Sequence, residues 1–430
     1  MKKLIAMLLA LVMVMGLVAC GQAPATDAPA ATTAPAAPEA APTEAQPEKI
    51  TLKVWGPSED QVAADGQTTS FLEAACAAFE EAHPEWDIEF VFEVCSEGDA
   101  GTMVTKDPSA AADVYAFAND QLGTLLNANA IARLGGDALA QVQADNSETM
   151  IASVTSGEGV YGVPFTGNTW FMYYDKSVYT EEDIKSLDAM MAKKPVGFEV
   201  TNTWYLPAFY FAAGGTMFGD GTDGAQGIKF GGNNGAAATK YLATAIASGK
   251  LVNDADGSGL DDLRNGKVGA IFSGTWDSAK VQEALGENFA AAQLPTITID
   301  GAEKQLMSFA GSKALGVNPN SKNLKAAYEL AAFMGSADAQ KLHFEMRKGD
   351  VVPCNTTLLK GDEFSKNVAA VAQEATFSNT SKIQPSIPEM GAYWTNAESM
   401  GKGLANKEVT VDNAAEKTEA WNTAINNTGL

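Results

Sequence analysis

The stretch DVYAFANDQLGTLLNANAIARL, residues 113–134, holds the strand-to-helix transition on which the fold class depends. Its first six residues, DVYAFA, are typical of a buried strand, and the polar NDQ leads into a helical pattern. Upstream, ITLKVW (50–55) and DIEFVFEV (87–94) alternate as strands around a helical repeat that begins at Phe71. The order strand, helix, strand, strand, helix predicts an α/β domain with a mainly parallel sheet.

Ligands of such sheets bind beyond the carboxyl ends of the strands. Two polar loops occupy that position, GPSEDQ (56–61) after the first strand and NDQ (119–121) after the third. We therefore expect a ligand site near both loops.

The chain begins with MKK, continues with the apolar run 4–18, and reaches LVAC at 17–20. This pattern indicates a signal peptide over residues 1–19, because the run is short for a membrane span of about 20 residues. LVAC resembles the bacterial lipobox, after which Cys20 becomes the lipidated first residue; an ordinary signal peptide ending in Cys is the alternative. Residues 20–48 then form the lipid anchor and a disordered Ala/Pro linker. The predicted location is the extracytoplasmic face of a bacterial cell membrane.

The chain has 430 residues, with 53 acidic against 29 basic side chains. Its acidity argues against nucleic acid and against direct adhesion to anionic lipid. About 380 residues after the linker exceed one ordinary core and predict two lobes.

The mature chain has three cysteines besides Cys20, and an exported protein can form disulfides. Cys76, in a predicted helix, and Cys95, at the end of the following strand, either form a disulfide or stay reduced. If they pair, Cys354 is left as a buried thiol. No CxxC spacing occurs, and the two histidines, His83 and His343, lie far apart in the sequence. We therefore expect no zinc site, no His-dependent catalytic triad and no cofactor.

A second block follows VYGVPF (160–165) and contains FMYYDK (171–176), a Gly-rich span (212–227) and KVGAIFSGTW (267–276). The last segment reads as a strand that runs into a turn. Within the Gly-rich span, GDGTDG (219–224) either holds a cation through its two aspartates or is turn chemistry alone.

Several aromatic residues follow turn or Pro/Gly signals instead of helical spacing. IPEMGAYW (387–394) is the clearest case, and we interpret it as a loop that presents two adjacent rings. Flat rings suit the C–H faces of sugars, and Asp, Glu and Asn accept hydrogen bonds from hydroxyl groups. Packing beneath loops is the alternative for each ring. The set is Phe117, Trp170, Trp204, Tyr205, Trp276, Tyr393 and Trp394.

Three segments resemble the solute-binding proteins of bacterial ABC sugar importers, specifically the maltose/maltodextrin-binding type: residues 112–134, 265–276 and 383–394. The resemblance implies that Phe117 stacks on sugar, that Asp120 binds it, and that Trp276 and Trp394 are stacking platforms. The resemblance also implies that Glu59 or Asp60 accepts a hydrogen bond from a hydroxyl group of the sugar.

Two positions depart from that family's pattern. Asn168 in VPFTGNTW (163–170) replaces an acidic residue, and Gln121 replaces an arginine after the binding aspartate. Both changes bear on which sugar and linkage are bound.

The resemblance implies a two-lobed periplasmic-binding-protein-like (type II) α/β fold with an inter-lobe cleft and a hinge. Lobe one is expected at 49–166 plus 312–361, and lobe two at 168–311 plus 362–430. A monomer would capture maltooligosaccharides by lobe closure and deliver them to a membrane permease driven by ATPase subunits. The chain itself has no GxxxxGK[ST] phosphate loop.

Rival functions remain open at this point. The same mechanism suits another oligosaccharide, a polyamine or an amino acid. A secreted glycoside hydrolase would need two carboxyl groups about 5 to 9 Å apart. A surface lipoprotein for adhesion would bind polymer without closing.

Overall fold

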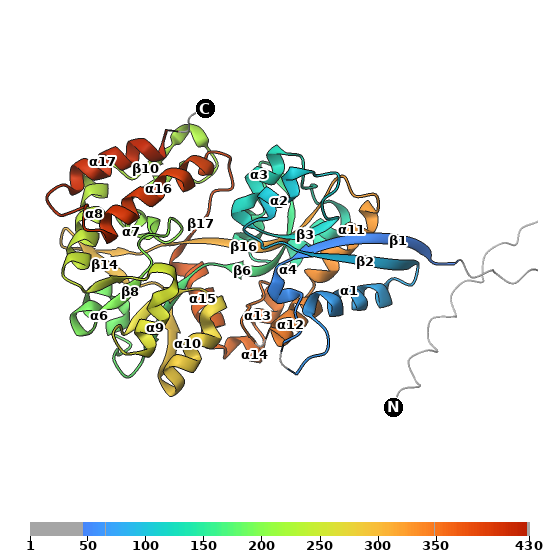
Figure 1. The fold of residues 1–430 in the computed structure, drawn as a ribbon, viewed down its shortest axis with the longest axis horizontal. Coiled ribbons are helices and arrows are strands. Elements are labelled where there is room, and N and C mark those ends of the chain that lie inside the picture. The colour runs from blue at the N-terminus through green and yellow to red at the C-terminus, as the bar shows by residue number, and fades with distance from the viewer. Residues whose placement is uncertain (1–45, 65, 348, 428–430) are drawn as a thin grey trace, which may run out of the picture. The chain divides into compact units, whose positions relative to one another are not determined.

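Residue Phe117 belongs to β3 (Val114–Ala118), which lies between β1 and β16 in a six-stranded sheet (Figure 1). The computed structural model describes residues 46–427 except 65 and 348. The predicted signal peptide, Cys20 and linker residues up to 45 lie outside the described residues.

The six-stranded sheet is parallel on one side and mixed on the other. β1 pairs in parallel with β2 and β3, whereas β16 runs antiparallel to both β3 and β6 and parallel to β17. The strands around β3 are β1 (Glu48–Gly56), β2 (Trp86–Val94), β6 (Gly162–Asn168), β16 (Ser308–Val317) and β17 (Ser381–Ile383).

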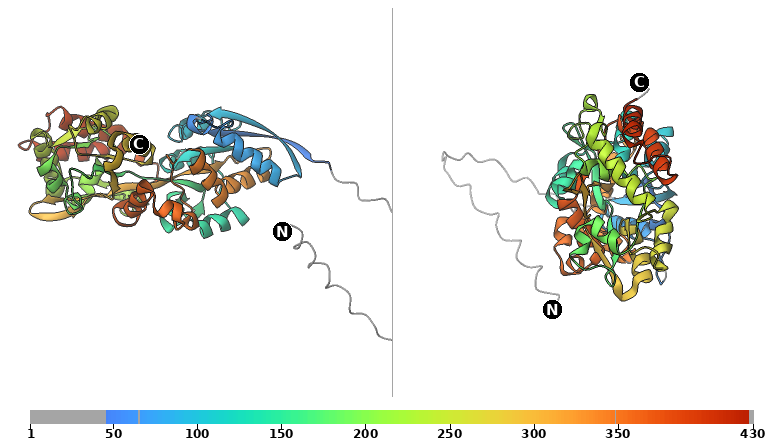
Figure 2. Two further views of the ribbon diagram at one scale, coloured as in Figure 1. Left: turned by 90° about the horizontal axis from the view of Figure 1, so that it is seen from below. Right: turned by 90° about the vertical axis from the view of Figure 1, so that its left-hand side faces the viewer.

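Both faces of this sheet are covered, as the strand alternation requires. Leu52 and Val54 of β1 enter one core together with α1 and α11, and Trp55 enters a second core with α2 and α3. Figure 2 shows α1 packed beside β1 and β2. The helices of this part are α1 (Phe71–Ala82), α2 (Ala100–Lys106), α3 (Leu122–Asn127), α4 (Gly136–Asp145), α5 (Glu148–Ser153), α11 (Leu324–Met334) and α12 (Ala337–Met346).

Local sequence fixes the start of α1. The Ser70 Oγ accepts a hydrogen bond from the backbone N–H of Glu73, and the Glu73 carboxylate accepts one from the backbone N–H of Ser70. This reciprocal pair satisfies two amides that the first turn leaves unpaired. The predicted helix is therefore found where the sequence places it.

A second, five-stranded sheet has the order β11-β8-β12-β7-β13. Its largest core gathers aromatic and aliphatic side chains from β7, β8, β12 and the flanking helices. Its strands are β7 (Phe171–Asp175), β8 (Val196–Phe198), β11 (Leu251–Asn253), β12 (Ala270–Ser273) and β13 (Phe289–Ala292). The helices of this part are α6 (Leu187–Lys193), α7 (Pro207–Ala212), α8 (Gly232–Ala247), α9 (Ser258–Arg264), α10 (Ser278–Leu285), α16 (Met390–Ala405) and α17 (Ala414–Ile425).

Among the described residues, several stretches of chain connect the parts of the fold built on the two sheets. β6 belongs to the first sheet and β7 to the second, although only residues 169 and 170 separate them. The Thr169 hydroxyl lies 2.9 Å from the Ser308 hydroxyl and donates to the Phe309 carbonyl at 2.6 Å, which ties two of these stretches together. A further stretch contains α13 (Thr356–Leu359), α14 (Asp362–Ser365) and α15 (Val368–Asn379); α15 contacts β7 and β13 of the second sheet before the chain returns to the first sheet at β17.

Short two-stranded ribbons complete the fold. They pair β4 (Thr155–Ser156) with β5 (Gly159–Val160), β9 (Thr216–Met217) with β10 (Ile228–Lys229), and β14 (Thr296–Ile299) with β15 (Ala302–Gln305). Across the part of the chain that the structure describes, no helix is both long and apolar enough to cross a membrane.

Candidate functional site

A cavity of about 510 Å³ opens where the ends of several strands meet the beginnings of α7 and α16. Its polar and aromatic lining comes from strands of the six-stranded sheet and the loops that follow them, from the segment before α7 and from α16. The lining residues are Glu97, Gly98, Ala118, Asp120, Gln121, Asn168, Thr203, Trp204, Lys313, Gln384 and Trp394. Four residues that the sequence predicted are therefore brought together: Asp120, Asn168, Trp204 and Trp394.

Two indole rings supply the aromatic surface of this cavity. Trp204 is held by its Nε1–H, which donates to the Gln384 Oε1 at 2.7 Å. The Trp276 ring lies outside the lining but continues the surface, because its centroid is 6.1 Å from that of Trp204 and the ring is 37 % exposed. Gly274 makes room for it, since a Cβ there would lie 2.0 Å from the Trp276 ring.

Trp394 and its neighbour Tyr393 lie in the first turn of α16, not in the loop expected from IPEMGAYW. Successive helical side chains point in different directions, so one ring lines the cavity and the other is buried. The Tyr393 hydroxyl donates to the Thr203 carbonyl at 2.7 Å. Tyr393 therefore holds the segment that carries Trp204 and presents no ring face to the cavity.

Three more predicted rings are buried as well. Phe117 is fully buried because alternation along the central strand β3 turns it into the core next to Tyr115. Trp170 and Tyr205 stack on each other with centroids 4.8 Å apart inside the core of the second sheet. The expectation that Phe117, Trp170, Tyr205 and Tyr393 offer ring faces to a ligand is corrected accordingly.

Asp120 lies in the 3-10 turn η2 (Asn119–Gln121) at the end of β3. Burial raises the pKa of its carboxyl group, against the hydrogen bond that Gln121 Nε2 donates to Oδ2 at 2.9 Å. A carboxylate in this position can accept hydrogen bonds from a ligand that enters the cavity.

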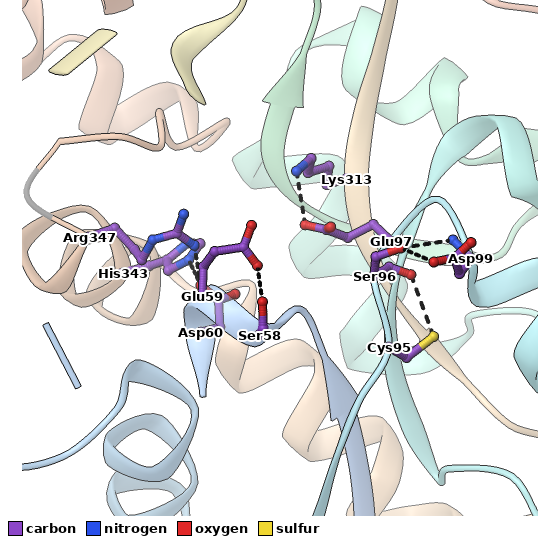
Figure 3. Close-up of polar contacts among 10 residues, drawn as sticks. All are labelled: Ser58, Glu59, Asp60, Cys95, Ser96, Glu97, Asp99, Lys313, His343 and Arg347. Carbon is purple, nitrogen blue, oxygen red and sulfur yellow. Dashed lines mark hydrogen bonds and ion pairs between the residues drawn. The ribbon is translucent and has the colours of Figure 1, made fainter. Parts of the chain in front are cut away.

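Glu97 and Lys313 form an ion pair at the cavity wall, with 3.0 Å between Nζ and Oε1 (Figure 3). Glu97 follows the second strand and Lys313 lies within β16. The sequence patterns predicted neither residue, nor Gly98, Ala118, Thr203 and Gln384, whereas Gln121 was singled out only as a departure from the family's pattern. The rule that ligands bind beyond the carboxyl ends of parallel strands also points to Glu97, because Glu97 follows β2.

Asp60, expected at the ligand, is buried against α12 instead. Its Oδ1 lies 2.8 Å from His343 Nε2 and 2.5 Å from the Arg347 guanidinium (Figure 3). Burial opposes ionisation, but the charges and hydrogen bonds of His343 and Arg347 outweigh it and lower the pKa of Asp60. Because Asp60 is already paired and does not line the cavity, the expectation of a hydroxyl acceptor at this position is corrected.

Glu59 is exposed and accepts a hydrogen bond from the Ser58 hydroxyl at 3.0 Å. It borders a separate cavity of about 390 Å³ with Arg347 and Asp350. Neither carboxylate of GPSEDQ therefore faces the cavity lined by Trp204 and Trp394.

The predicted alternative of a Cys76–Cys95 disulfide is wrong, because Cys76, Cys95 and Cys354 are all free and buried. Cys76 enters the core on one face of the six-stranded sheet and Cys95 the core on the other. The sheet therefore separates the two thiols.

The aspartates of GDGTDG bond within their own turn. The Asp220 carboxylate accepts a hydrogen bond from the Thr222 hydroxyl at 2.6 Å, and the Asp223 carboxylate accepts one from the backbone N–H of Ala225 at 3.0 Å. Such local hydrogen bonds are typical of turns, and a turn stabilised in this way was one of the two alternatives for GDGTDG. His83 lies 3.2 Å from Glu85 and 3.7 Å from Glu329, a cluster that the spacing of the two histidines did not reveal.

Residues 74–372 match the family described as bacterial extracellular solute-binding protein. The chain belongs to this family. Among relatives, the galactooligosaccharide-binding protein of Bacillus subtilis (strain 168) is 27 % identical over 84 % of this chain and 88 % of its own length. The maltodextrin-binding protein MdxE of the same organism is 31 % identical, over 57 % of this chain and 62 % of that protein.

Solved structures of similar fold support membership of this solute-binding family. One, described as being with acarbose, is 48 % identical with a TM-score of 0.83 and covers 89 % of this chain and all of that chain. The maltodextrin-binding protein MalE1 from L. casei BL23, solved without ligand, is 26 % identical with a TM-score of 0.78 and covers 88 % of this chain and 99 % of its own. The predicted two-lobed α/β fold of the solute-binding type is confirmed, and the named relatives are binding proteins.

Proposed function

We propose that this solute-binding protein captures maltose-type oligosaccharides in the cavity lined by Trp204 and Trp394. The observation that carries the proposal is the combination of these two indole rings with Asp120, Asn168 and the Glu97–Lys313 pair around one 510 Å³ space. Indole rings match the C–H faces of pyranoses, and the polar groups match their hydroxyls. The names of the maltodextrin-binding relatives and the acarbose complex support the same ligand class.

Ligand binding would act by closing the lobes. We propose lobe one at 49–166 plus 312–361 and lobe two at 168–311 plus 362–430. Asp120 and Lys313 would bind from the first, and Trp204 and Trp394 from the second. A ligand that contacts both stabilises the closed arrangement by its differential affinity.

The closed protein would deliver its sugar to a membrane permease with ATPase subunits. Lipidation at Cys20 would hold it, as a monomer, at the extracytoplasmic face of the cell membrane. These partners and the anchor follow from the solute-binding family and from the LVAC motif.

Calorimetric titration of the mature protein with maltose, maltotriose, maltotetraose and acarbose tests the ligand. We expect micromolar dissociation constants, equivalent to about −8 kcal/mol. Galactooligosaccharides belong in the same panel because the relative that matches 84 % of the chain carries that name. If galactooligosaccharides bind more tightly than every α-glucan, the proposed ligand class is wrong, but the proposed capture by lobe closure stands.

Two further measurements separate the rival functions. Chromatography of maltotetraose after hours with catalytic amounts of protein should show no shortening, whereas cleavage would indicate a glycoside hydrolase. Small-angle scattering should show compaction on adding sugar, whereas binding without compaction would favour a polymer-capturing lipoprotein.

A further inference from the structure

Gln384 stands out at the cavity because half of its amide group is paired and the other half is not. The residue is 3 % exposed and lines the cavity beside Trp204 and Trp394. Its Oε1 accepts the hydrogen bond from Trp204 Nε1 at 2.7 Å. Its Nε2 is buried and has no hydrogen-bond partner among the described residues.

The orientation of this amide follows from chemistry. An indole N–H only donates, so the atom that faces Trp204 must be the carbonyl oxygen of Gln384. The NH₂ group is then the half that is left unpaired. A buried donor without a partner is energetically unfavourable, so this site favours a ligand that brings an acceptor oxygen.

The backbone of Gln384 is fixed independently of the side chain. Its N–H donates to the Ala310 carbonyl at 2.9 Å, which extends the pairing of β16 and β17 by one residue. Beyond it, the chain continues to α16, which carries Trp394. Gln384 thus links the first sheet to Trp204 through a side-chain hydrogen bond and to Trp394 through the chain that leads into α16.

We propose that Gln384 is a ligand-binding and positioning residue: Oε1 holds the Trp204 ring, while Nε2 donates to an acceptor oxygen of the bound sugar. This inference rests on the proposed function and adds a contact that distinguishes ligands by the position of one oxygen. A sugar that lacks that oxygen leaves the buried donor unpaired, so the site discriminates against it.

The test measures how tightly wild-type protein and Gln384→Met bind a set of maltotriose analogues. In each analogue, one hydroxyl group is replaced by hydrogen, or one ring or glycosidic oxygen by sulfur or a methylene group. Methionine keeps the length of the side chain but removes both hydrogen-bonding groups. We expect Gln384→Met to bind maltotriose about five- to tenfold more weakly. One analogue should lose affinity for the wild type and show no further loss with the variant.

Gln373→Met is the matched control, because Gln373 is also 3 % exposed but does not line the cavity. It should change the affinity for all analogues by the same factor or not at all. Melting temperatures and circular dichroism of each variant establish that it is folded.

A uniform loss across all analogues in Gln384→Met would reduce the residue to a support for Trp204 and overturn the proposed contact. Unchanged affinity would overturn both parts of the inference while leaving the proposed function intact. Wild-type protein that binds no member of the panel would overturn the proposed function, and the role of Gln384 with it.

Discussion

Asp60 and Asp120 both lie just beyond the ends of strands of the same sheet, but in the part of the chain that the structure describes one is paired with basic side chains and the other is not. Each follows a strand of the parallel set, Asp60 in η1 (Ser58–Asp60) and Asp120 in η2. Asp60 is paired with His343 of α12 and with Arg347, which directly follows this helix. Asp120 has no ion pair among the described residues, bonds to its neighbour Gln121 and faces the cavity.

A strand end therefore determines where a carboxylate lies but not whether it is free to bind. Distant parts of the chain decide that. His343 of α12 and Arg347 just beyond it reach the end of β1, whereas the end of β3 lines a cavity together with Asn168 and Trp204. The same pair of environments gives the two carboxyl groups opposite pKa shifts.

The largest expected effect is on stability at the Asp60 cluster. Asp60→Asn removes the carboxylate and leaves His343 and Arg347 without their buried partner, so the free energy of unfolding in urea should fall by about 3 kcal/mol. Glu59→Gln, one residue earlier and exposed, should change it by less than about 0.5 kcal/mol. If Asp60→Asn instead lost sugar affinity at unchanged stability, Asp60 would be a ligand group after all.

The next effect is on affinity at the cavity. Replacing Trp204 or Trp394 with Ala should weaken maltotriose binding by about 1 to 3 kcal/mol, measured by calorimetry, because these rings line the cavity. Trp276→Ala should cost about 1 kcal/mol or less, since Trp276 contacts the site through Trp204. An equal or larger loss for Trp276 would show that the ligand extends beyond the cavity.

The pKa of Asp120 predicts a smaller, pH-dependent effect. Because burial raises it above the ordinary value of about 3.9, wild-type affinity should fall as the pH is lowered through the raised pKa, where the acceptor becomes protonated. Asp120→Asn should weaken binding at pH 7 by about 1 kcal/mol and remove this dependence. A pH dependence of affinity that is the same in wild-type protein and in Asp120→Asn would contradict a direct role for Asp120.

Stability should respond to pH with opposite signs at the two aspartates. The raised pKa of Asp120 gives a contribution that is present below about pH 3.9 and lost as the pH rises through the folded-state value. The lowered pKa of Asp60 gives one that is present above about pH 3.9 and lost as the pH falls through its folded-state value. Unfolding of Asp60→Asn and Asp120→Asn at several pH values separates the two contributions.

The smallest effect concerns the thiols on the two faces of the sheet. Dithiothreitol should leave the melting temperature unchanged, because Cys76 and Cys95 are free. Removal of a native disulfide from a small secreted domain typically costs about 2 to 5 kcal/mol, so a bridge would be visible in the same scan. A clear drop in melting temperature on reduction would contradict the separation of the two thiols.

Much of the fold could be predicted from short-range pattern. The alternation in 50–55 and 87–94 and the apolar run in 113–118 gave the strands β1, β2 and β3 at nearly their observed bounds. Of the candidate site residues, Asp120, Asn168, Trp204 and Trp394 line one cavity, although whether it binds sugar is the proposal stated above. Phe117, Trp170, Tyr205 and Tyr393 were misplaced because a turn signal next to an aromatic residue does not tell which way its ring points.

The sequence alone indicated the α/β class and the positions of β1, β2 and β3 along the chain, since hydrophobic periodicity and turn residues act within a few residues of chain. Only the tertiary structure decided which polar groups remain available to a ligand. Arg347 reaches Asp60 and Gln384 reaches Trp204 across 287 and 180 positions of sequence, respectively. Such pairings depend on how helices and sheets pack, because hydrogen bonds and ion pairs form only between groups that the packed backbone brings within about 3 Å.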